Sequence, residues 1–537
     1  MPSLTRNEFA ALAERARNEY PGSRLAIPVG LRLLADQLTP VLAYRRLVAA
    51  DTRTEPSFLL ESVENGEHQG RYSILGRHPT QQVLAFGSDA TIVGADGSRT
   101  ARTLANPLTL PRELTHDIRL IEPGADRATA HLPDAFLGGW AGYAGYDTVR
   151  YTEPEKLAST PTDDRGLPDL HFAFYPGAVI FDHVDTVVHI VELAILDQHT
   201  DIGSLYSQTI AKLEATAETV QTHSKPLASG RVSRDGTAGV MDSNTERAAF
   251  ETAVERAVEY TKAGDIFQVV LGQRFERESP ADPFDVYRAL RAVNPSPYMG
   301  YMQTLGCILV AASPEILCRV HTSDVGVRTV TNRPLAGTRK RGSTPDEDAA
   351  LERDLLSDPK ETAEHAMLVD LARNDVGRVA DPGSIAVGPV MAVERYSHVM
   401  HISSTVTGVL REGLDAWDAL HAALPVGTVS GAPKIRAMQI IDELEPFKRG
   451  PYGGGFGTVG LDGDMDIALA LRTIVVPTAD WSPEAHQNDA PFRWTYHVQA
   501  GAGVVLDSHP AREFDETVNK ARALARAIDL AEQAFGS

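Results

Sequence analysis

Residues 244–275, NTERAAFETAVERAVEYTKAGDIFQVVLGQRF, contain two kinds of hydrophobic pattern side by side. The first part predicts a capped amphipathic helix, because alanine and valine recur at helical spacing over 253–258 and Gly264 ends the pattern. The last part, IFQVVLGQRF, is rich in apolar β-formers and predicts a strand. The type of connection between such helices and strands decides the fold class.

Runs typical of strands lie on both sides of this segment. Before it, residues 55–200 hold several short β-type runs separated by Gly, Pro and Asp turns. After it come GCILVAAS (306–313), DIALALRTIVV (466–476) and TYHVQAGAGVVL (495–506), and then a long helix from about Ala511. Strands and helices mix without a regular βαβ alternation. The sequence therefore predicts an α+β fold with large, mainly antiparallel β-sheets flanked by helices.

The chain changes composition between residues 221 and 243, where apolar residues become rare and Ser, Gly and Pro more frequent. Such a stretch is typical of a linker or a long exposed loop. We therefore expect an N-terminal half over 1–225 and a C-terminal domain over 244–537. No internal repeat is visible.

Composition excludes several classes of function. The formal net charge of −21 over 537 residues argues against nucleic acid or an anionic membrane surface as the main partner. The two cysteines, Cys307 and Cys318, predict a reducing compartment without a disulfide framework. No run approaches the roughly 20 apolar residues of a membrane span, and the N-terminus lacks the apolar core of a signal peptide. We expect a cytoplasmic protein.

The stretch KETAEHAMLVDLARND, residues 360–375, has two interpretations. Asp358 is a good N-cap, and Glu361 stands three residues later, which predicts a capping box. Glu364 and His365 share the face of Glu361 and need another explanation. The string is not HExxH, so zinc is disfavoured, whereas a glutamate pair on one turn suits Mg²⁺. The alternative is a solvated acidic face.

The segment GPYGGGFGTVG, residues 450–460, contains a literal G-x-G-x-x-G at Gly455, Gly457 and Gly460. A dinucleotide fingerprint must follow a strand and open a helix. Neither flank fits here, so we reject a Rossmann site. The alternative is a glycine loop that places backbone N–H groups near an anion.

Three other segments carry polar side chains whose ordinary explanation is structural. NRPLAGTRKRG, residues 332–342, reads as a solvated basic loop, although its Gly-Thr pair would let a ligand approach closely. Glu516 and Lys520 have the i, i+4 spacing of an exposed helix pair, worth roughly 0.3–0.5 kcal/mol. Glu315 ends a buried-looking strand, and His401 lies in an apolar run. Taken singly, each favours a structural role.

Together, these segments resemble the chorismate-utilising enzymes, and within them the component I type of anthranilate synthase. The resemblance covers residues 244–525 in the family's order, and its departures are small: Leu335 stands where Ile is usual, and Gly272 where Ser is usual. The N-terminal LLESVE, GRYSILG and GGWAGYAGYD resemble the same family's regulatory half. The main matching strings are GDIFQVVLGQRF, NPSPYM, SPE, RPLAGT, DPKETAEHAMLVDLARNDVGRV, VMH, PVGTVSGAPKIRAM, YGGGFG, DIALALRT, QAGAGVV and ETVNKARAL.

The resemblance implies a set of site residues around chorismate, a dicarboxylate. Glu364 and Glu516 would hold Mg²⁺ against the ring carboxylate, with Glu361 in support. Glu315 would be the general acid for the departing ring hydroxyl, which requires burial to raise its pKa. His401 would position substrate or handle protons during pyruvate loss, and Lys520 would orient the carboxylates. The implied substrate contacts are Gly337, Thr338, Thr428, Tyr452, Arg472, Gly501, Ala502 and Gly503.

Two positions distinguish the reactions within the family. Relatives that add water carry a lysine base at the place of Gln268, and an amide cannot act as that base. Relatives that make 4-amino-4-deoxychorismate often carry a nucleophilic lysine at the place of Ala336. The pair therefore favours anthranilate synthase, with aminodeoxychorismate synthase component I as the alternative.

The resemblance also implies partners. Neither Cys307 nor Cys318 lies in the G-x-C-x-G-x-Q setting of a glutaminase nucleophile, so we expect a separate glutamine amidotransferase subunit and a hetero-oligomer. Tryptophan is expected as a feedback inhibitor bound at Glu61, Ser62, Pro297, Tyr298 and Met299. From other classes, a dinucleotide oxidoreductase and a catalytically silent amino-acid sensor remain as alternatives.

Overall fold

The computed structural model describes residues 2–48, 53–64, 68–123, 132–222, 229–231, 239–396, 399–481 and 492–535, with only the backbone described for 63, 64, 68 and 69. Most strands lie in two large sheets, and every ladder between described strands is antiparallel except the one joining β1 and β7. The α+β prediction is confirmed.

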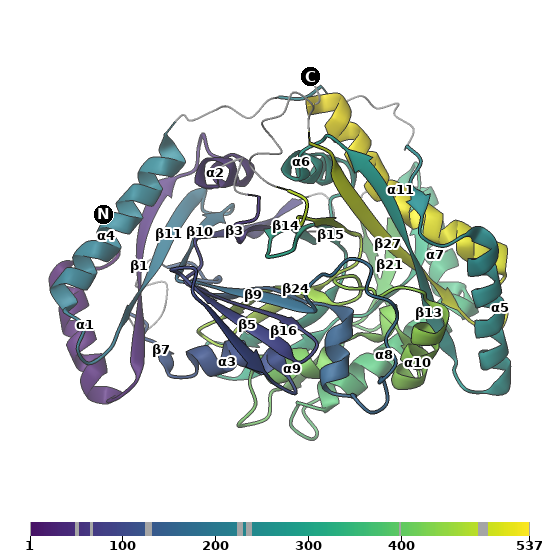
Figure 1. The fold of residues 1–537 in the computed structure, drawn as a ribbon, viewed down its shortest axis with the longest axis horizontal. Coiled ribbons are helices and arrows are strands. Elements are labelled where there is room, and N and C mark those ends of the chain that lie inside the picture. The colour runs from purple at the N-terminus through teal and green to yellow at the C-terminus, as the bar shows by residue number, and fades with distance from the viewer. Residues whose placement is uncertain are drawn as a thin grey trace.

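The larger sheet curves across the molecule from β1 to β13, and the second large sheet lies beneath it (Figure 1). In spatial order the larger sheet comprises β12 (Asp242–Ser243), β13 (Gln268–Ser279), β27 (Trp494–Val504), β26 (Thr473–Pro477), β15 (Cys307–Ser313), β14 (Tyr298–Gln303), β2 (Ser57–Glu64), β3 (His68–Arg77), β10 (Gly177–Asp182), β11 (Val187–Leu196), β1 (Arg24–Leu34) and β7 (Ile118–Leu120), with β23 (Gly431–Ala432) beside β13.

The second sheet and a small third sheet complete the β-structure. The second comprises β19 (Ala386–Val387), β22 (Val406–Val409), β17 (Arg328–Asn332), β16 (Ile316–Thr322), β25 (Met465–Leu469), β24 (Gly455–Gly460), β8 (Gly139–Ala144), β9 (Leu170–Tyr175), β4 (Gln81–Phe86), β5 (Asp89–Gly94) and β6 (Arg99–Thr103). The third comprises β18 (Leu335–Lys340), β21 (Val399–Ser403) and β20 (Ala392–Arg395).

Helices cover the outer faces of these sheets, and Figure 1 shows α1, α4, α2, α6 and α11 along the outside of the larger one. The helices are α1 (Arg6–Glu19), α2 (Pro40–Leu47), α3 (Leu110–Thr115), α4 (Ile202–Gln221), α5 (Arg247–Ala263), α6 (Pro283–Val293), α7 (Pro345–Ser357), α8 (Pro359–Gly377), α9 (Ala416–Ala423), α10 (Lys434–Leu444) and α11 (Pro510–Phe535).

Two main hydrophobic cores follow from this layering. One surrounds the second sheet: Phe58 meets Tyr175 on the face toward the larger sheet, and Phe172 packs against Trp417 of α9 on the other face. The other lies between the larger sheet and its outer helices and includes Phe9, Leu213 and Ile528. No helix among the described residues is long and apolar enough to cross a membrane.

Both large sheets contain strands from both sides of the expected linker. In the larger sheet β2 pairs with β14, and in the second β8 pairs with β24. Part of the linker, 223–228 and 232–238, lies outside the described residues. The division at 225–244 stays a prediction, and the two halves share their sheets.

The segment that opened the sequence analysis folds as predicted, into α5 and β13. Gly264 is the C-cap of α5 and has the left-handed φ of 83° that favours glycine. The N-cap, Glu246, makes no side-chain capping bond. By contrast, the single strand predicted over 466–476 is wrong, because the chain bends at Arg472 (φ 46°) and divides the run between β25 and β26 in different sheets.

The glycine-rich segment 450–460 and the basic segment 332–342 each contribute a strand. Gly455–Gly460 forms the strand β24 and opens no helix, so the rejection of a dinucleotide fingerprint is confirmed. The basic segment is not a solvated loop. It forms β18, and three of its arginines pair with acidic side chains: Arg333 with Glu394, Arg339 with Asp354 and Asp358, and Arg341 with Asp348.

Asp358 caps α8 as predicted, accepting from the backbone N–H groups of Lys360 and Glu361. The predicted capping box is wrong. Since Asp358 also terminates α7, its own N–H donates to Leu355 O and is not available to Glu361. The Glu361 carboxylate instead faces Arg339, whose Nη1 lies 3.4 Å from Glu361 Oε1.

A buried ion pair fixes α8 against α10. Lys434 Nζ lies 2.6 and 2.8 Å from the two oxygens of Asp375, and both side chains are at least nine-tenths buried. Burial raises the pKa of Asp375 and lowers that of Lys434, so each charge depends on the other.

We predict that Lys434→Met destabilises the protein by about 3–5 kcal/mol, because it leaves Asp375 buried without a counter-charge. The double variant Lys434→Met/Asp375→Leu should recover most of this loss. Urea unfolding followed by circular dichroism measures both. Arg373→Met, which removes an exposed ion pair on the same helix, is the control and should cost about 0.5 kcal/mol or less. Equal stability of Lys434→Met and wild type would contradict the prediction.

Candidate active site

The pairing of β13 with β27 forms one wall of the candidate site (Figure 1). Gly503 lies opposite Val270, and a Cβ at Gly503 would be 2.5 Å from Gln268 Nε2. A Cβ at Gly501 would be 2.9 Å from the Tyr452 hydroxyl oxygen. Glycine at these positions therefore lets the Gln268 amide and the Tyr452 phenol lie directly against the backbone. Ala502, between them, is fully buried.

Gln268 connects this wall to α8. Its Nε2 donates to Glu364 Oε1 at 3.1 Å, and its own Oε1 is buried without a hydrogen-bond partner among the described residues. Glu361 lies one turn earlier on the same face, where its Oε2 would be 3.1 Å from a Cβ at Gly337. Burial and then the Glu364 carboxylate raise the pKa of Glu361, so the two carboxylates are close enough to repel each other.

On the other side of the wall, α11 supplies the predicted Glu516 and Lys520. Lys520 Nζ lies 2.7 Å from Glu516 Oε1 and donates to Gly501 O at 2.8 Å. The i, i+4 pair is therefore real, but it also binds the backbone of β27. A cavity of about 670 Å³ is lined by both residues and also by Arg472.

Arg472 is an unpaired cation at this cavity. Its guanidinium makes no hydrogen bond or ion pair with any residue that the structure describes, and burial lowers its pKa. A smaller cavity of about 20 Å³ also contacts Arg472 and places His401 beside it. A guanidinium in this state suits a carboxylate ligand, because it offers parallel donors with no competing anion.

His401 is held in a neutral state. Its Nδ1 donates to Gly337 O at 2.8 Å and lies 3.1 Å from Thr338 Oγ1. Gly337 has φ 65° and forms a bulge in the pairing of β18 with β21, which turns its carbonyl to the imidazole. Burial, and secondarily Arg472, lower the pKa of His401 to about 4. At neutral pH Nε2 is therefore an acceptor.

Glu315 lies between β15 and β16 and is 3% exposed. Thr428, in the short turn Gly427–Val429, donates from Oγ1 to Glu315 Oε1 at 2.8 Å. Burial raises the pKa of Glu315 to about 8 despite this bond. The expected burial of this carboxylic acid is confirmed, and it is protonated at neutral pH.

The carboxylates are of the ligand type that Mg²⁺ prefers, but they do not form a complete coordination shell. The described residues contain no group of three His, Cys, Asp or Glu side chains arranged to hold a metal ion. Mg²⁺ uses one or two carboxylates and completes its shell with water and substrate, so Glu364 and Glu361 on one helical turn are sufficient protein ligands. Glu361 would have to share its carboxylate with Arg339, and Glu516 with Lys520.

Sequence reasoning missed the buried pair Glu445 and Arg449, which supports the site from behind. Arg449 donates to Val429 O at 2.6 Å and to Val270 O at 2.8 Å, and its guanidinium lies 5.7 Å from the centre of the Tyr452 ring. Glu445 accepts from Gly272 N at 2.7 Å. Its i, i+4 spacing is the same as that of an exposed pair, so the sequence offered no signal for burial.

The chain is similar to known proteins over most of its length. The family model for chorismate binding enzymes matches residues 56–526. The chain belongs to this family. It is 51% identical over 523 residues to the chloroplastic anthranilate synthase alpha subunit 1 of Oryza sativa subsp. indica, covering 95% of this chain and 89% of the relative. It is 43% identical over 537 residues to anthranilate synthase component 1 of Pseudomonas aeruginosa, covering 99% of each.

Solved structures of chorismate binding enzymes share the fold. The crystal structure of anthranilate synthase component I from Streptococcus pneumoniae matches with a TM-score of 0.67 at 35% identity, covering 92% of this chain and 99% of that one. The menaquinone-specific isochorismate synthase of Escherichia coli matches with a TM-score of 0.63 at 19% identity, covering 97% and 99%, which supports the fold alone.

The residues expected to bind tryptophan lie on or beside two neighbouring strands of the larger sheet, β2 from the N-terminal half of the chain and β14 from the C-terminal half. Met299 is the register partner of Glu61, and Tyr298 that of Ser62. Pro297 directly precedes this pair. The Glu61 carboxylate is already engaged, with Arg291 Nε at 2.7 Å and the hydroxyl of Tyr287 at 2.5 Å. An incoming ammonium would have to compete for it.

We predict that Glu315→Gln lowers chorismate turnover by at least about 100-fold, because the amide keeps the Thr428 bond but has no acidic proton. The substitution should also change how the stability of the protein depends on pH. Between pH 4.5 and about 8 the folded wild type retains a proton that the unfolded chain loses, so stability falls as pH rises across this window, and the amide removes that fall. Urea unfolding at pH 5 and pH 8 compares the two proteins. A pH-independent difference in stability would contradict the assignment.

Proposed function

We propose that the chain is the chorismate-using subunit of an anthranilate synthase, converting chorismate and ammonia to anthranilate, pyruvate and water in tryptophan biosynthesis. The observation that carries this proposal is the buried Gln268 amide bonded to Glu364 within a glycine-lined site. An amide there cannot activate water, which favours ammonia as the nucleophile. The curated relatives named above, at 51% and 43% identity, support the same reaction.

The described side chains account for the acid and charge requirements of this reaction. As ammonia adds at C2 of the ring, the neutral Glu315 donates a proton to the departing hydroxyl, which leaves as water. Arg472 binds a substrate carboxylate, and Lys520 adds positive charge beside it. Neutral His401 positions the substrate through Nε2 for the loss of pyruvate.

Magnesium is part of the proposal. Glu364, supported by Glu361 and Glu516, would hold the ion, which would neutralise the substrate's ring carboxylate when bound. The glycines at 501 and 503 leave space for the substrate between the carboxylates and β27.

The proposed nitrogen source is a partner subunit. Cys307 and Cys318 are buried in strands, and burial raises the pKa of both thiols, so neither suits a glutaminase nucleophile. A separate glutamine amidotransferase would supply ammonia in a hetero-oligomer. We also propose a cytoplasmic location, although the plant relatives carry the word chloroplastic in their names.

We predict that the purified chain alone makes anthranilate and pyruvate from chorismate, Mg²⁺ and ammonium at elevated pH, where more free NH₃ exists, but not from glutamine. Excess EDTA should abolish the activity. Anthranilate fluorescence and a coupled pyruvate assay provide the readouts. Glutamine-dependent turnover by the single chain would exclude the need for a partner, and 4-amino-4-deoxychorismate as the product would favour the aminodeoxychorismate synthase alternative.

Glu364→Gln and Glu516→Gln should each reduce turnover at least about 100-fold, because each removes a metal or substrate-site charge and leaves the side-chain shape. Isothermal titration of Mg²⁺ in the presence of chorismate should show weakened ion binding. Asp370→Asn, an exposed change on α8, is the matched control and should keep wild-type activity. Near-normal turnover by Glu364→Gln would contradict the assignment of Glu364 as a Mg²⁺ ligand.

We further propose feedback inhibition by tryptophan at the junction of β2 and β14. Support comes from the register that joins Glu61 and Ser62 to Met299 and Tyr298, which gives polar and apolar groups for an ammonium and an indole. Such a site acts through two conformations with different affinities for the two ligands, so chorismate and tryptophan must weaken each other's binding equally.

Ser62→Arg should relieve tryptophan inhibition at least about tenfold and leave uninhibited turnover within about twofold, because the arginine fills the effector site and does not reach the carboxylates of α8 and α11. Inhibition curves with millimolar tryptophan measure this. Ser88→Arg, on an exposed turn of the same half, is the control. A wild-type rate insensitive to tryptophan, or loss of catalysis in Ser62→Arg, would contradict the regulatory proposal.

A further inference from the structure

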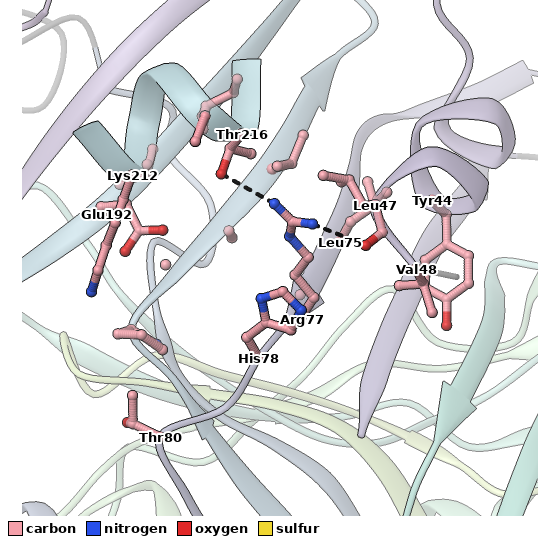
Figure 2. Close-up of a pocket in the computed structure, with 18 residues that line it drawn as sticks. Tyr44, Leu47, Val48, Leu75, Arg77, His78, Thr80, Glu192, Lys212 and Thr216 are labelled. Carbon is pink, nitrogen blue, oxygen red and sulfur yellow. Dashed lines mark hydrogen bonds between the residues drawn. The ribbon is translucent and has the colours of Figure 1, made fainter. Parts of the chain in front are cut away.

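A second cavity lies on the outer face of the larger sheet, between α2 and α4 (Figure 2). Several strands of the sheet separate it from β13 and β27, which form the candidate active site. Its volume is about 260 Å³, and β3, β10 and β11 form its floor. This size is close to the lower end of ligand sites, roughly 300–1,000 Å³, and suits a small molecule. The apolar part of the wall comprises Tyr44, Leu47, Val48, Leu75, Val179 and Ile190.

Glu192 is an unpaired carboxylate in this cavity. Figure 2 shows it projecting from β11 below α4. It makes no hydrogen bond or ion pair within the described part of the chain, and burial raises its pKa. Its register partner is Gly177, where a Cβ would lie 3.2 Å from Glu192 Cδ, so glycine gives the carboxylate room. Lys212 lines the rim but is exposed and beyond ion-pair distance.

Arg77 carries the opposite charge, and it too forms no direct ion pair with any residue that the structure describes. Its guanidinium donates to Leu47 O at 2.9 Å and to Thr216 Oγ1 at 3.4 Å, both neutral acceptors, which link α2 and α4 (Figure 2). Burial lowers the pKa of Arg77. The residue after it, His78, also lines the cavity and has a φ of 53°, which is uncommon outside glycine.

Glu192 and Arg77 attract each other across the cavity, and Lys212 also favours the charged form of Glu192. Because no direct ion pair joins them in the described structure, these attractions replace only part of the hydration that each group loses. A ligand that carries both an ammonium and a carboxylate would satisfy the two at once. The aliphatic and aromatic walls would accept an apolar substituent.

We propose that this cavity binds a small zwitterion of the apolar α-amino acid class, with its ammonium on Glu192 and its carboxylate on Arg77. The lining residues include none of those assigned to chorismate or to tryptophan inhibition, so the site stands or fails independently of the proposed function.

Isothermal titration of the full-length chain with L-leucine, L-phenylalanine and L-tryptophan tests the site, together with the amide and the N-acetyl derivative of each. At least one amino acid should bind, and its amide and N-acetyl forms should each bind at least about tenfold more weakly, because each lacks one of the two charges. Absence of binding by all three amino acids, or equal binding of the derivatives, would overturn the proposal.

Variants locate the binding. Glu192→Gln should weaken it about tenfold to hundredfold, and Ala215→Phe, which fills the cavity from the exposed face of α4, should abolish it. Glu214→Gln, on the same helix, is the control and should bind as wild type. Thermal unfolding confirms that each variant is folded. Binding that survives both Glu192→Gln and Ala215→Phe but is lost in Ser62→Arg belongs to the tryptophan site and overturns the inference.

Discussion

The pairing of β13 with β27 is the constraint on which the active site depends. The two strands form eleven consecutive register pairs although more than two hundred residues separate them in sequence. Their register places Gly501 and Gly503 where neighbouring side chains must approach the backbone itself. Gln268 at the start of β13, Tyr452 in the turn before β24 and Lys520 on α11 each approach β27 there. A slip of one residue would reverse which side chains face the site.

The larger sheet also gives a physical route between the two halves of the chain. In its order, β2 lies beside β14, then β15, β26 and β27. The strand β2, which bears Glu61, is therefore three ladders from β26, which begins directly after Arg472. Glu315 lies two residues after the end of β15. A change in how β2 packs on β14 would act directly on the strands that adjoin Arg472 and Glu315, the residues proposed to bind substrate and donate a proton.

Local electrostatics in the site oppose the acidic character of the whole chain. Arg472 supplies an uncompensated cation, while burial keeps Glu315 protonated and His401 neutral at physiological pH. These states come from desolvation rather than from the net charge of −21, because remote carboxylates are screened by salt. An anionic substrate therefore meets a positive group at Arg472, whereas Glu361, Glu364 and Glu516 supply negative charge elsewhere in the site.

The sequence by itself determined features that depend on a few neighbouring residues. Helical and strand periodicity placed α5, β13 and α11, Gly264 and Asp358 marked helix ends, and the flanks of Gly455 excluded a dinucleotide site. The ordered motifs identified the family and predicted which residues act in its site. Only the tertiary structure decided which of those residues meet. In the folded chain, the backbone bends at Arg472, the Asp358 N–H bonds to the end of α7, and the buried Arg449 lies against the Tyr452 ring. The reason is that local hydrogen bonding is set within one or two turns, whereas burial and charge pairing are set by segments hundreds of residues apart.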